Sequence, residues 1–211
     1  MCRLLYVRSK REFSIGEHLN ALSRIAENSK EYQGHGWGCA YLHGGEWRIH
    51  KDIPPIWEDG DLERFGSTNL LIAHARSAFK NKGITIENNM PFCDGNYVFV
   101  FNGELRGVRL REKGRTGAEK IFQFIKRFAT EDMEAAVKRA TGIIDKRTEY
   151  VRAMNLIIAD KERAYVACFF NEDPDYFTLR TKKNGLLIVC SEPYPGESDW
   201  TDIPNRSLSV F

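Results

Sequence analysis

The sequence has little net charge and no long apolar run. Its 31 Lys and Arg residues nearly balance its 29 Asp and Glu residues, which leaves a formal charge of +2. Nucleic-acid-binding proteins carry a clustered basic excess, so that class is disfavoured. No stretch approaches the roughly 20 apolar residues that cross a bilayer, and the N-terminus lacks the apolar region and cleavage site of a signal peptide. We therefore expect a soluble, cytoplasmic protein that binds neither nucleic acid nor membrane.

The sequence also lacks any pair of cysteines spaced C-x-x-C. Its five cysteines are an odd number, which fits neither a disulfide framework nor a tetracysteine zinc site. His35, Cys39 and His43 are spaced four residues apart. On a strand each such interval spans roughly 13 Å, so the three cannot share one ion. We expect no metal and no cofactor.

No repeat, low-complexity segment or linker interrupts the 211 residues, so residues 1–211 are expected to form a single domain. Apolar spacing predicts strands near both ends and helices in the middle, which indicates an α+β fold with two antiparallel sheets covered by helices. The expected strands are 3–8, 69–76, 96–102, 154–159, 164–169, 176–179, 186–190 and 207–211, with a hairpin turn at 43–46, and the expected helices are 14–30, 116–130 and 132–144.

Met1-Cys2 is the first candidate for chemistry. A small second residue favours removal of the initiator methionine, which would give Cys2 both a thiol and a free α-amine. The α-amine of a terminal residue has an ordinary pKa of about 7.7–8.0 and can serve as the general base for its own thiol. The alternative is that position 2 is a small apolar residue entering a strand.

Two further candidates follow expected strands. Asn102 and Gly103 can point a side-chain amide and a backbone N–H at one spot, as in an oxyanion hole, or they can form a common Asn-Gly turn. Arg76, followed by Ser77, closes an apolar strand where its guanidinium could bind a carboxylate at a pocket edge or face solvent. His74 shares a strand face with Arg76 and is a candidate structural support.

The start of the expected 116–130 helix is the last candidate. Thr116 and Glu119 have the T-x-x-E pattern of a capping box. The free N–H groups at this helix start, next to Thr116 and Gly117, could bind the charged or polar end of a substrate. The capping box alone already explains Thr116 and Glu119.

Taken in order, these motifs resemble the class II glutamine amidotransferases, which belong to the N-terminal nucleophile hydrolases. The likeness is greatest to the compact, stand-alone group and covers essentially the whole chain. The motifs are MCRLL, HGWGCAY, AHARSA, NNMPF, FNGEL, the T-x-x-E helix start, CSEPY, and a tail with Trp200, Pro204, Ser207 and Leu208.

The resemblance implies a four-layer αββα sandwich and a hydrolase without cofactor. By it, Cys2 would attack the side-chain amide of glutamine, with its own α-amine as base, to form a γ-glutamyl thioester that water hydrolyses. Asn102 and Gly103 would hold the oxyanion. The substrate would lie against Arg76, which binds its α-carboxylate, and against Ser77, Gly103, Thr116 and Gly117. In a synthetase, the released ammonia would pass to a separate acceptor site.

Two positions depart from the family pattern. The family has an acidic residue, which binds the substrate α-ammonium group, where this chain has Gly117. It also commonly has His where Phe101 precedes Asn102. Activity further depends on removal of Met1, because otherwise the free α-amine belongs to methionine.

Three hypotheses follow. The chain is a glutamine amidohydrolase, a hydrolase of another γ-glutamyl or related amide, or a binding or regulatory subunit without catalysis. A small molecule is the expected substrate partner in the first two. A synthetase subunit that receives ammonia and a second copy of the chain are open as protein partners.

Overall fold

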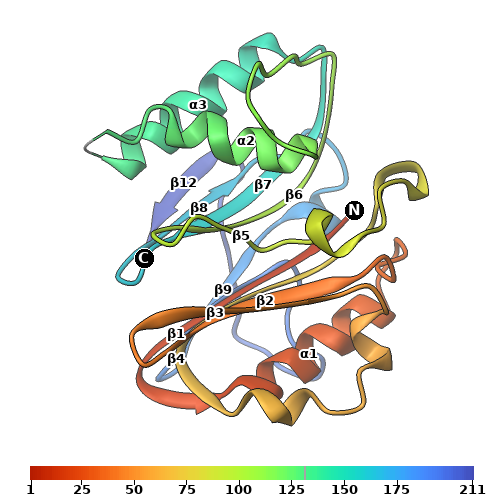
Figure 1. The fold of residues 1–211 in the computed structure, drawn as a ribbon, viewed down its shortest axis with the longest axis vertical. Coiled ribbons are helices and arrows are strands. Elements are labelled where there is room, and N and C mark those ends of the chain that lie inside the picture. The colour runs from red at the N-terminus through yellow and green to blue at the C-terminus, as the bar shows by residue number, and fades with distance from the viewer. Residues whose placement is uncertain (131) are drawn as a thin grey trace.

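Two antiparallel sheets lie face to face, and helices cover the outer side of each (Figure 1). The computed structural model describes residues 1–130 and 132–211. Within these residues the larger sheet has the strand order β11-β9-β10-β1-β4-β2-β3 and the smaller sheet the order β12-β8-β7-β6-β5. The expected four-layer α+β architecture is therefore confirmed.

The strands of the larger sheet are β1 (Arg3–Ser14), β2 (Trp37–His43), β3 (Glu46–Asp52), β4 (Ser67–Ala75), β9 (Arg180–Lys183), β10 (Leu187–Cys190) and β11 (Thr201–Asp202). Those of the smaller sheet are β5 (Phe92–Cys93), β6 (Val98–Arg106), β7 (Tyr150–Ala159), β8 (Ala164–Cys168) and β12 (Ser207–Val210). The helices are α1 (Ile15–Glu27), α2 (Gly117–Lys126), α3 (Met133–Arg147) and the short α4 (Pro174–Phe177), with 3-10 turns at Ile56–Glu58, Leu62–Phe65, Phe79–Asn81 and Ile86–Asn88.

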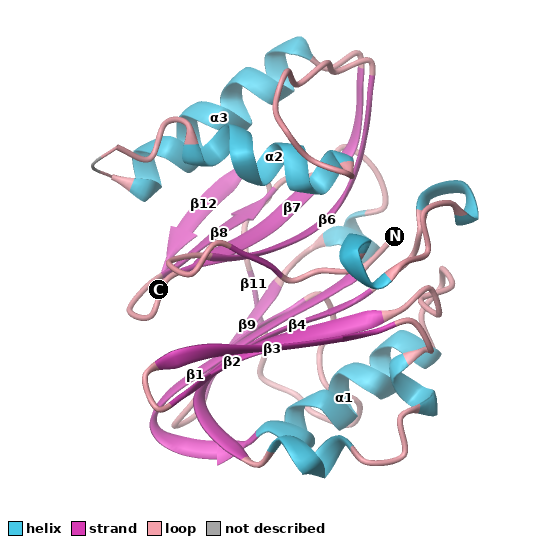
Figure 2. Ribbon diagram, viewed as in Figure 1, coloured by secondary structure: helices cyan, strands magenta, loops and turns pink. Residues whose placement is uncertain are grey.

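The alternation of side chains along β1 shows how the layers form. Leu4 and Tyr6 pack into the core shared with the smaller sheet, whereas Leu5 and Val7 pack into the core beneath α1. Successive side chains of a strand point to opposite faces, so β1 is apolar on both faces because it is covered on both. Figure 2 shows the same arrangement, with α1 outside the larger sheet and α2 and α3 outside the smaller one.

Local capping sets where the long helices begin. Ser14 accepts a hydrogen bond from the Glu17 N–H at 3.2 Å at the start of α1, and Thr116 accepts one from the Glu119 N–H at 3.1 Å at the start of α2. Such caps satisfy N–H groups that have no partner within the helix. On the buried face of α2, Phe122 stacks against Phe99 of β6 with ring centroids 5.1 Å apart, which fixes this helix on the smaller sheet.

Three expectations about local structure are wrong. The segment 176–179 is not a strand, because Pro174 opens α4 and Phe177 ends it, and proline favours the first position of a helix. The first strand continues past residue 8 to Ser14 through an irregularity in its pairing with β4. The strand expected to end at residue 102 runs on to Arg106, so Asn102 and Gly103 lie inside β6 and are not a turn.

None of the described helices is long and apolar enough to cross a membrane.

Candidate active site

A cavity of about 920 Å³ opens where the two sheets meet the N-terminus of the chain. Its walls come from the N-terminus, the loop that follows β4, strand β6 and the start of α2. In Figure 1 the N-terminus lies beside this loop, drawn in yellow. The predicted site residues that line the cavity are Cys2, Arg76, Ser77, Gly103, Thr116 and Gly117. Six positions spread over more than a hundred residues of sequence are thus brought to one place.

Cys2 contacts the backbone of Ser77 across the cavity floor. The Ser77 N–H donates a hydrogen bond to Cys2 Sγ at 3.4 Å, and the Ser77 carbonyl oxygen lies 3.7 Å from the same sulfur. The side chain is 9% exposed. The thiol therefore has one fixed orientation at the wall of the cavity.

The surroundings of Cys2 act on its pKa in opposite directions. Burial raises the pKa of the thiol, and the α-ammonium of Met1, the Ser77 N–H and the charge of Arg76 lower it by smaller amounts. The net direction is upward, because a buried thiolate loses the hydration that it has in water. With Met1 in place, the thiol is the stable form, and the neighbouring Cys2 nitrogen is an amide that cannot accept a proton.

The loop carrying Arg76 and Ser77 is anchored by His35 and Gly36. Backbone hydrogen bonds join the His35 N–H to the Arg76 carbonyl at 3.0 Å and the Arg76 N–H to the Gly36 carbonyl at 2.8 Å. The His35 ring then accepts the Ala78 N–H at 2.9 Å. His35 has a structural role here, which explains this residue without a metal ion.

Arg76 is held by neutral oxygens. Its two terminal nitrogens donate to Asn89 Oδ1 and to the Gly83 carbonyl, both at 2.8 Å, and the side chain is largely buried. Burial lowers the pKa of this guanidinium, although the group stays charged at neutral pH. Within the described residues it has no carboxylate partner, so a positive charge beside Cys2 is left unbalanced.

Asn102 has an unusual environment for a buried amide. Its side chain is 1% exposed, yet neither the amide nitrogen nor the amide oxygen has a hydrogen-bond partner within the described residues. It does not line the cavity itself, but both of its neighbours, Phe101 and Gly103, do. Buried polar groups are normally paired, and an unpaired one needs an explanation such as a catalytic role.

Gly103 is required by close packing of the backbone. A Cβ atom at this position would lie 2.3 Å from the Ala153 carbonyl oxygen and 2.5 Å from the Phe101 ring. Any side chain would therefore force β6 away from β7. The glycine lets the strand keep its register past Asn102 while facing the cavity.

His74 lies in β4, on the other sheet. It is fully buried, close to the Phe101 backbone, and neither ring nitrogen has a hydrogen-bond partner within the described residues. Burial, together with the charge of Arg76, lowers the pKa of His74 to about 3, so the ring is neutral. Its position between the sheets agrees with the structural role expected from the sequence.

The start of α2 forms the far wall of the cavity. Thr116 uses its hydroxyl to cap the Glu119 N–H, so that oxygen is already occupied. The Glu119 carboxylate accepts the Arg115 N–H at 2.7 Å, one residue earlier than the capping-box pattern predicts. A Cβ at Gly117 would meet no atom within 4 Å, so there is empty space where the resemblance leads one to expect an acidic side chain.

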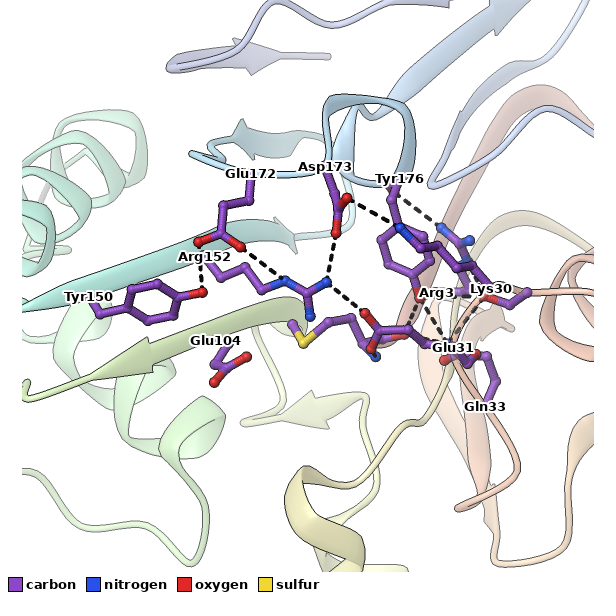
Figure 3. A network of polar contacts seen from close by, with 12 residues as sticks. Arg3, Lys30, Glu31, Gln33, Glu104, Tyr150, Arg152, Glu172, Asp173 and Tyr176 are labelled. Carbon is purple, nitrogen blue, oxygen red and sulfur yellow. Dashed lines mark hydrogen bonds and ion pairs between the residues drawn. The ribbon is translucent and has the colours of Figure 1, made fainter.

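Sequence reasoning missed Glu31 and Arg152, which also line the cavity. The α-ammonium of Met1 is paired with Glu31, and the second Glu31 oxygen is 2.8 Å from Arg152. Figure 3 shows Arg152 reaching from β7 towards Glu31, Glu172 and Asp173. Glu31 belongs to no motif. Arg152 offered a signal, because it is the one charged residue in the largely apolar segment Tyr150–Ala159.

The Met1 carbonyl is held as firmly as its amine. It accepts hydrogen bonds from the Gln33 side-chain amide and from the Tyr176 hydroxyl, the latter at 2.7 Å. The Gln33 amide oxygen is buried and has no partner within the described residues. Both the α-ammonium group and the carbonyl oxygen of Met1 are thus hydrogen-bonded beside the candidate nucleophile.

In residues 1–130 and 132–211, no three His, Cys, Asp or Glu side chains are arranged to hold a metal ion.

Comparison with solved structures identifies the fold. A glutamine aminotransferase class-II domain protein from Silicibacter pomeroyi superimposes with a TM-score of 0.68 over 99% of this chain and 94% of its own, at 16% sequence identity. The fold is that of the class II glutamine amidotransferase domains. A protein from Pseudomonas aeruginosa described as a predicted glutamine amidotransferase gives a TM-score of 0.60 at 17% identity, over 100% of this chain and 97% of its own. The resemblance inferred from the motifs is confirmed, and at these identities the likeness establishes the fold alone.

Curated proteins of similar sequence are hydrolases. The γ-glutamyl-hercynylcysteine sulfoxide hydrolase of Mycobacterium tuberculosis is 23% identical over 177 residues, which cover 82% of this chain and 73% of that protein. The enzyme of the same name from Mycolicibacterium smegmatis is 24% identical over 183 residues, with coverages of 82% and 75%. No protein-family model matches the chain. The chain is thus similar in fold to class II glutamine amidotransferase domains and in sequence to γ-glutamyl-hercynylcysteine sulfoxide hydrolases.

Proposed function

We propose that the chain hydrolyses a γ-glutamyl amide through Cys2 once Met1 has been removed. The observation that carries the proposal is the convergence of Cys2, Arg76 and Gly103 on one cavity, with the unpaired Asn102 amide behind it. These are a nucleophile, a carboxylate-binding cation and two donors for an oxyanion. The similarity to γ-glutamyl hydrolases and amidotransferases supports the same chemistry.

The reaction would have two steps. Cys2 Sγ attacks the γ-carbonyl carbon while the Cys2 α-amine takes the thiol proton, and the Asn102 amide and the Gly103 N–H stabilise the oxyanion. The carbon–nitrogen bond then breaks, the departing amine receives the proton, and a γ-glutamyl thioester remains. Water attacks the thioester, releasing glutamate and the free thiol.

The substrate carboxylate and ammonium groups would bind at separate charges. Arg76 is the partner proposed for the α-carboxylate, with Ser77, Thr116 and Gly117 at the walls. Glu31 is the partner proposed for the α-ammonium, because it already holds an ammonium group, that of Met1, and loses it when Met1 leaves. This would supply the negative charge that Gly117 does not.

The size of the cavity favours a substrate larger than glutamine. Cavities of about 300–1,000 Å³ hold drug-sized ligands, and this one has about 920 Å³. A γ-glutamyl compound with a sizeable amine part would fill it better than a free amino acid. Glutamine is the second candidate, because the amidotransferase fold favours it. A synthetase partner that accepts its ammonia, and assembly with a second copy of the chain, are part of that second proposal.

The test is hydrolysis of L-glutamine and of γ-glutamyl dipeptides by protein whose mass shows that Met1 has been removed. Release of glutamate should disappear in Cys2→Ala. Cys93→Ala is the matched control, because Cys93 is also a free cysteine but lies outside the cavity. Glutamate release that survives Cys2→Ala would refute the mechanism, and the absence of release from every γ-glutamyl compound would refute the function.

A further inference from the structure

The cavity is far more basic than the chain as a whole. Seven Lys or Arg side chains line it against two Glu side chains, whereas the whole chain has a formal charge of only +2. Concave surfaces lined by one sign of charge concentrate the field and attract ligands of the opposite sign. Only the cations without a carboxylate partner are free to bind an anionic ligand.

Two of the seven are already neutralised by carboxylates. Arg152 lies 2.8 Å from both Glu31 and Asp173. Arg115 lies 2.9 Å from Glu119. The second acidic residue of the lining, Glu104, is paired with Arg106. The charges of Arg152, Arg115 and Glu104 are therefore largely cancelled by their ion-pair partners.

Four others have no carboxylate partner anywhere in the described part of the chain. Lys80 and Lys82 come from the loop after β4, and Arg109 and Lys120 come from the loop after β6 and from α2. Three segments of the chain therefore bring unpaired cations to one cavity. Lys80, Lys82 and Arg109 are exposed to solvent. Charges within a Debye length of about 8 Å are screened only partly, so cations gathered at a concave surface attract an anion.

The γ-glutamyl group cannot account for these cations. It carries one carboxylate and one ammonium, which the proposed function assigns to Arg76 and Glu31, and so it is neutral overall. The remaining positive charge of the cavity favours an anionic group on the other part of the substrate.

Building on the proposed function, we propose that the amine released from the γ-glutamyl amide carries one or more anionic groups, bound by Lys80, Lys82, Arg109 and Lys120. The assignment follows from the cations left unpaired at the cavity after the γ-glutamyl group is placed. It makes the enzyme selective for γ-glutamyl conjugates of acidic amines over neutral ones.

A matched set of substrates tests this directly. γ-Glutamyl-glycine and γ-glutamyl-glycinamide differ chiefly in the charge at the end of the amine part, and γ-glutamyl-aspartate adds a second carboxylate. We expect kcat/KM to rise from the glycinamide to the glycine to the aspartate compound, by about tenfold or more for the first carboxylate. Added salt should reduce this preference and leave the glycinamide compound unaffected.

Variants of the cavity residues test which side chains cause the preference for an anionic amine part. The double variant Lys82→Ala, Arg109→Ala should lose most of the preference for the glycine compound while its activity on the glycinamide compound stays close to that of the parent. Lys146→Ala, an exposed lysine outside the cavity, should leave the preference unchanged. A preference that persists in the double variant would overturn the assignment to these residues.

The preference for an anionic amine part and the γ-glutamyl hydrolysis itself can be refuted separately. Equal hydrolysis of the charged and neutral compounds would overturn the inference and leave the γ-glutamyl hydrolase intact. If nothing is cleaved, binding of the same three compounds to Cys2→Ala still decides the point: tighter binding of the glycine and aspartate compounds supports an anion-selective cavity, and equal or absent binding contradicts it.

Discussion

The α-ammonium group of Met1 donates a hydrogen bond to the carboxylate of Glu31, inside the cavity that Cys2 lines. The side chain of Met1 is only 11% exposed. Although burial alone would raise the pKa of Glu31, this hydrogen bond and the charges of Met1 and Arg152 hold that pKa below its usual value. The carboxylate is therefore ionised at neutral pH and fastens the first residue over the candidate nucleophile.

Glu31→Gln should destabilise the protein that retains Met1. The change leaves a partly buried ammonium without its countercharge, which should lower the free energy of unfolding by about 1–3 kcal/mol. Glu27→Gln is the control, because Glu27 is exposed and forms no ion pair within the described residues, and it should change stability by less than about 0.5 kcal/mol. Urea unfolding measures the stability of both variants. If Glu31→Gln and Glu27→Gln lower the free energy of unfolding equally, the ion pair between Met1 and Glu31 does not stabilise the protein.

In protein without Met1, Glu31→Gln should weaken substrate binding. We expect KM for γ-glutamyl compounds to rise about tenfold, with a smaller effect on kcat, because the bond to the substrate ammonium is made in the ground state as well as the transition state. Steady-state kinetics measure this. An unchanged KM would show that the substrate ammonium binds elsewhere.

Gly117→Asp should partly restore the binding lost in Glu31→Gln. The position has empty space for a side chain, and an acidic residue in the first turn of a helix is favourable. KM of the double variant should fall back towards the parent value. Gly142→Asp is the control, because that glycine also has open space around it but lies in α3, outside the cavity. Equal effects of the two aspartates would remove any specific role of position 117.

Asn102→Leu should separate catalysis from stability. Because neither amide atom of Asn102 is hydrogen-bonded, we expect the free energy of unfolding to stay the same or to rise. The loss of an oxyanion donor should lower kcat by about 10²–10³.

Asn155 provides the matched control, as the residue paired with Asn102 in β7. Both polar atoms of its amide are hydrogen-bonded: the nitrogen donates to the Phe177 carbonyl at 2.6 Å and the oxygen accepts the Phe169 N–H at 2.8 Å. Asn155→Leu should therefore cost about 2–4 kcal/mol of stability. Chemical unfolding of both variants checks the contrast, and an Asn102→Leu protein that is as destabilised as Asn155→Leu would contradict it.

His74 should make stability depend on pH. Its pKa of about 3 in the folded protein is below the ordinary value of 6.5, chiefly because of burial. Well above pH 6.5, His74 is neutral in both the folded and the unfolded protein, so its titration takes nothing from the stability there. As the pH falls from 6.5 towards 3, only the unfolded chain binds a proton at this residue, and stability is lost by up to about 1.4 kcal/mol per pH unit.

His74→Leu should remove this dependence. The difference in unfolding free energy between about pH 7 and about pH 5.5 should be smaller in the variant than in the parent, since other titrating groups contribute equally to both. Urea titrations at the two pH values give the comparison. Parallel curves would show that His74 is accessible to protons in the folded state.

The layered fold could be predicted because its signals are local. The continuous apolar run at the start of β1 and the cap at Thr116 can be read directly from the sequence. The prediction for 176–179 is wrong because apolar residues in so short a run fit either a strand or a helical turn, and here Pro174 opens a helix.

The candidate site was only partly accessible from sequence. Cys2 stands out because removal of Met1 would make it the N-terminal residue. Arg76 and the Asn102-Gly103 pair stand out because they come at the ends of apolar runs. Glu31 could not be found in this way, since its contact with Met1 depends on where the loop after α1 returns to the N-terminus. The same holds for the unpaired lysines, which gain meaning only when two loops meet at one cavity.

We propose that Cys2 is the nucleophile and that it acts as the N-terminal residue. The most direct measurement is labelling with a diazoketone analogue of glutamine, followed by mass mapping of the N-terminal peptide. We expect one label per chain, on a peptide that begins at Cys2 and has lost Met1, and no label in Cys2→Ala. A protein that hydrolyses γ-glutamyl amides while it retains Met1, or that is labelled at another residue, would contradict it.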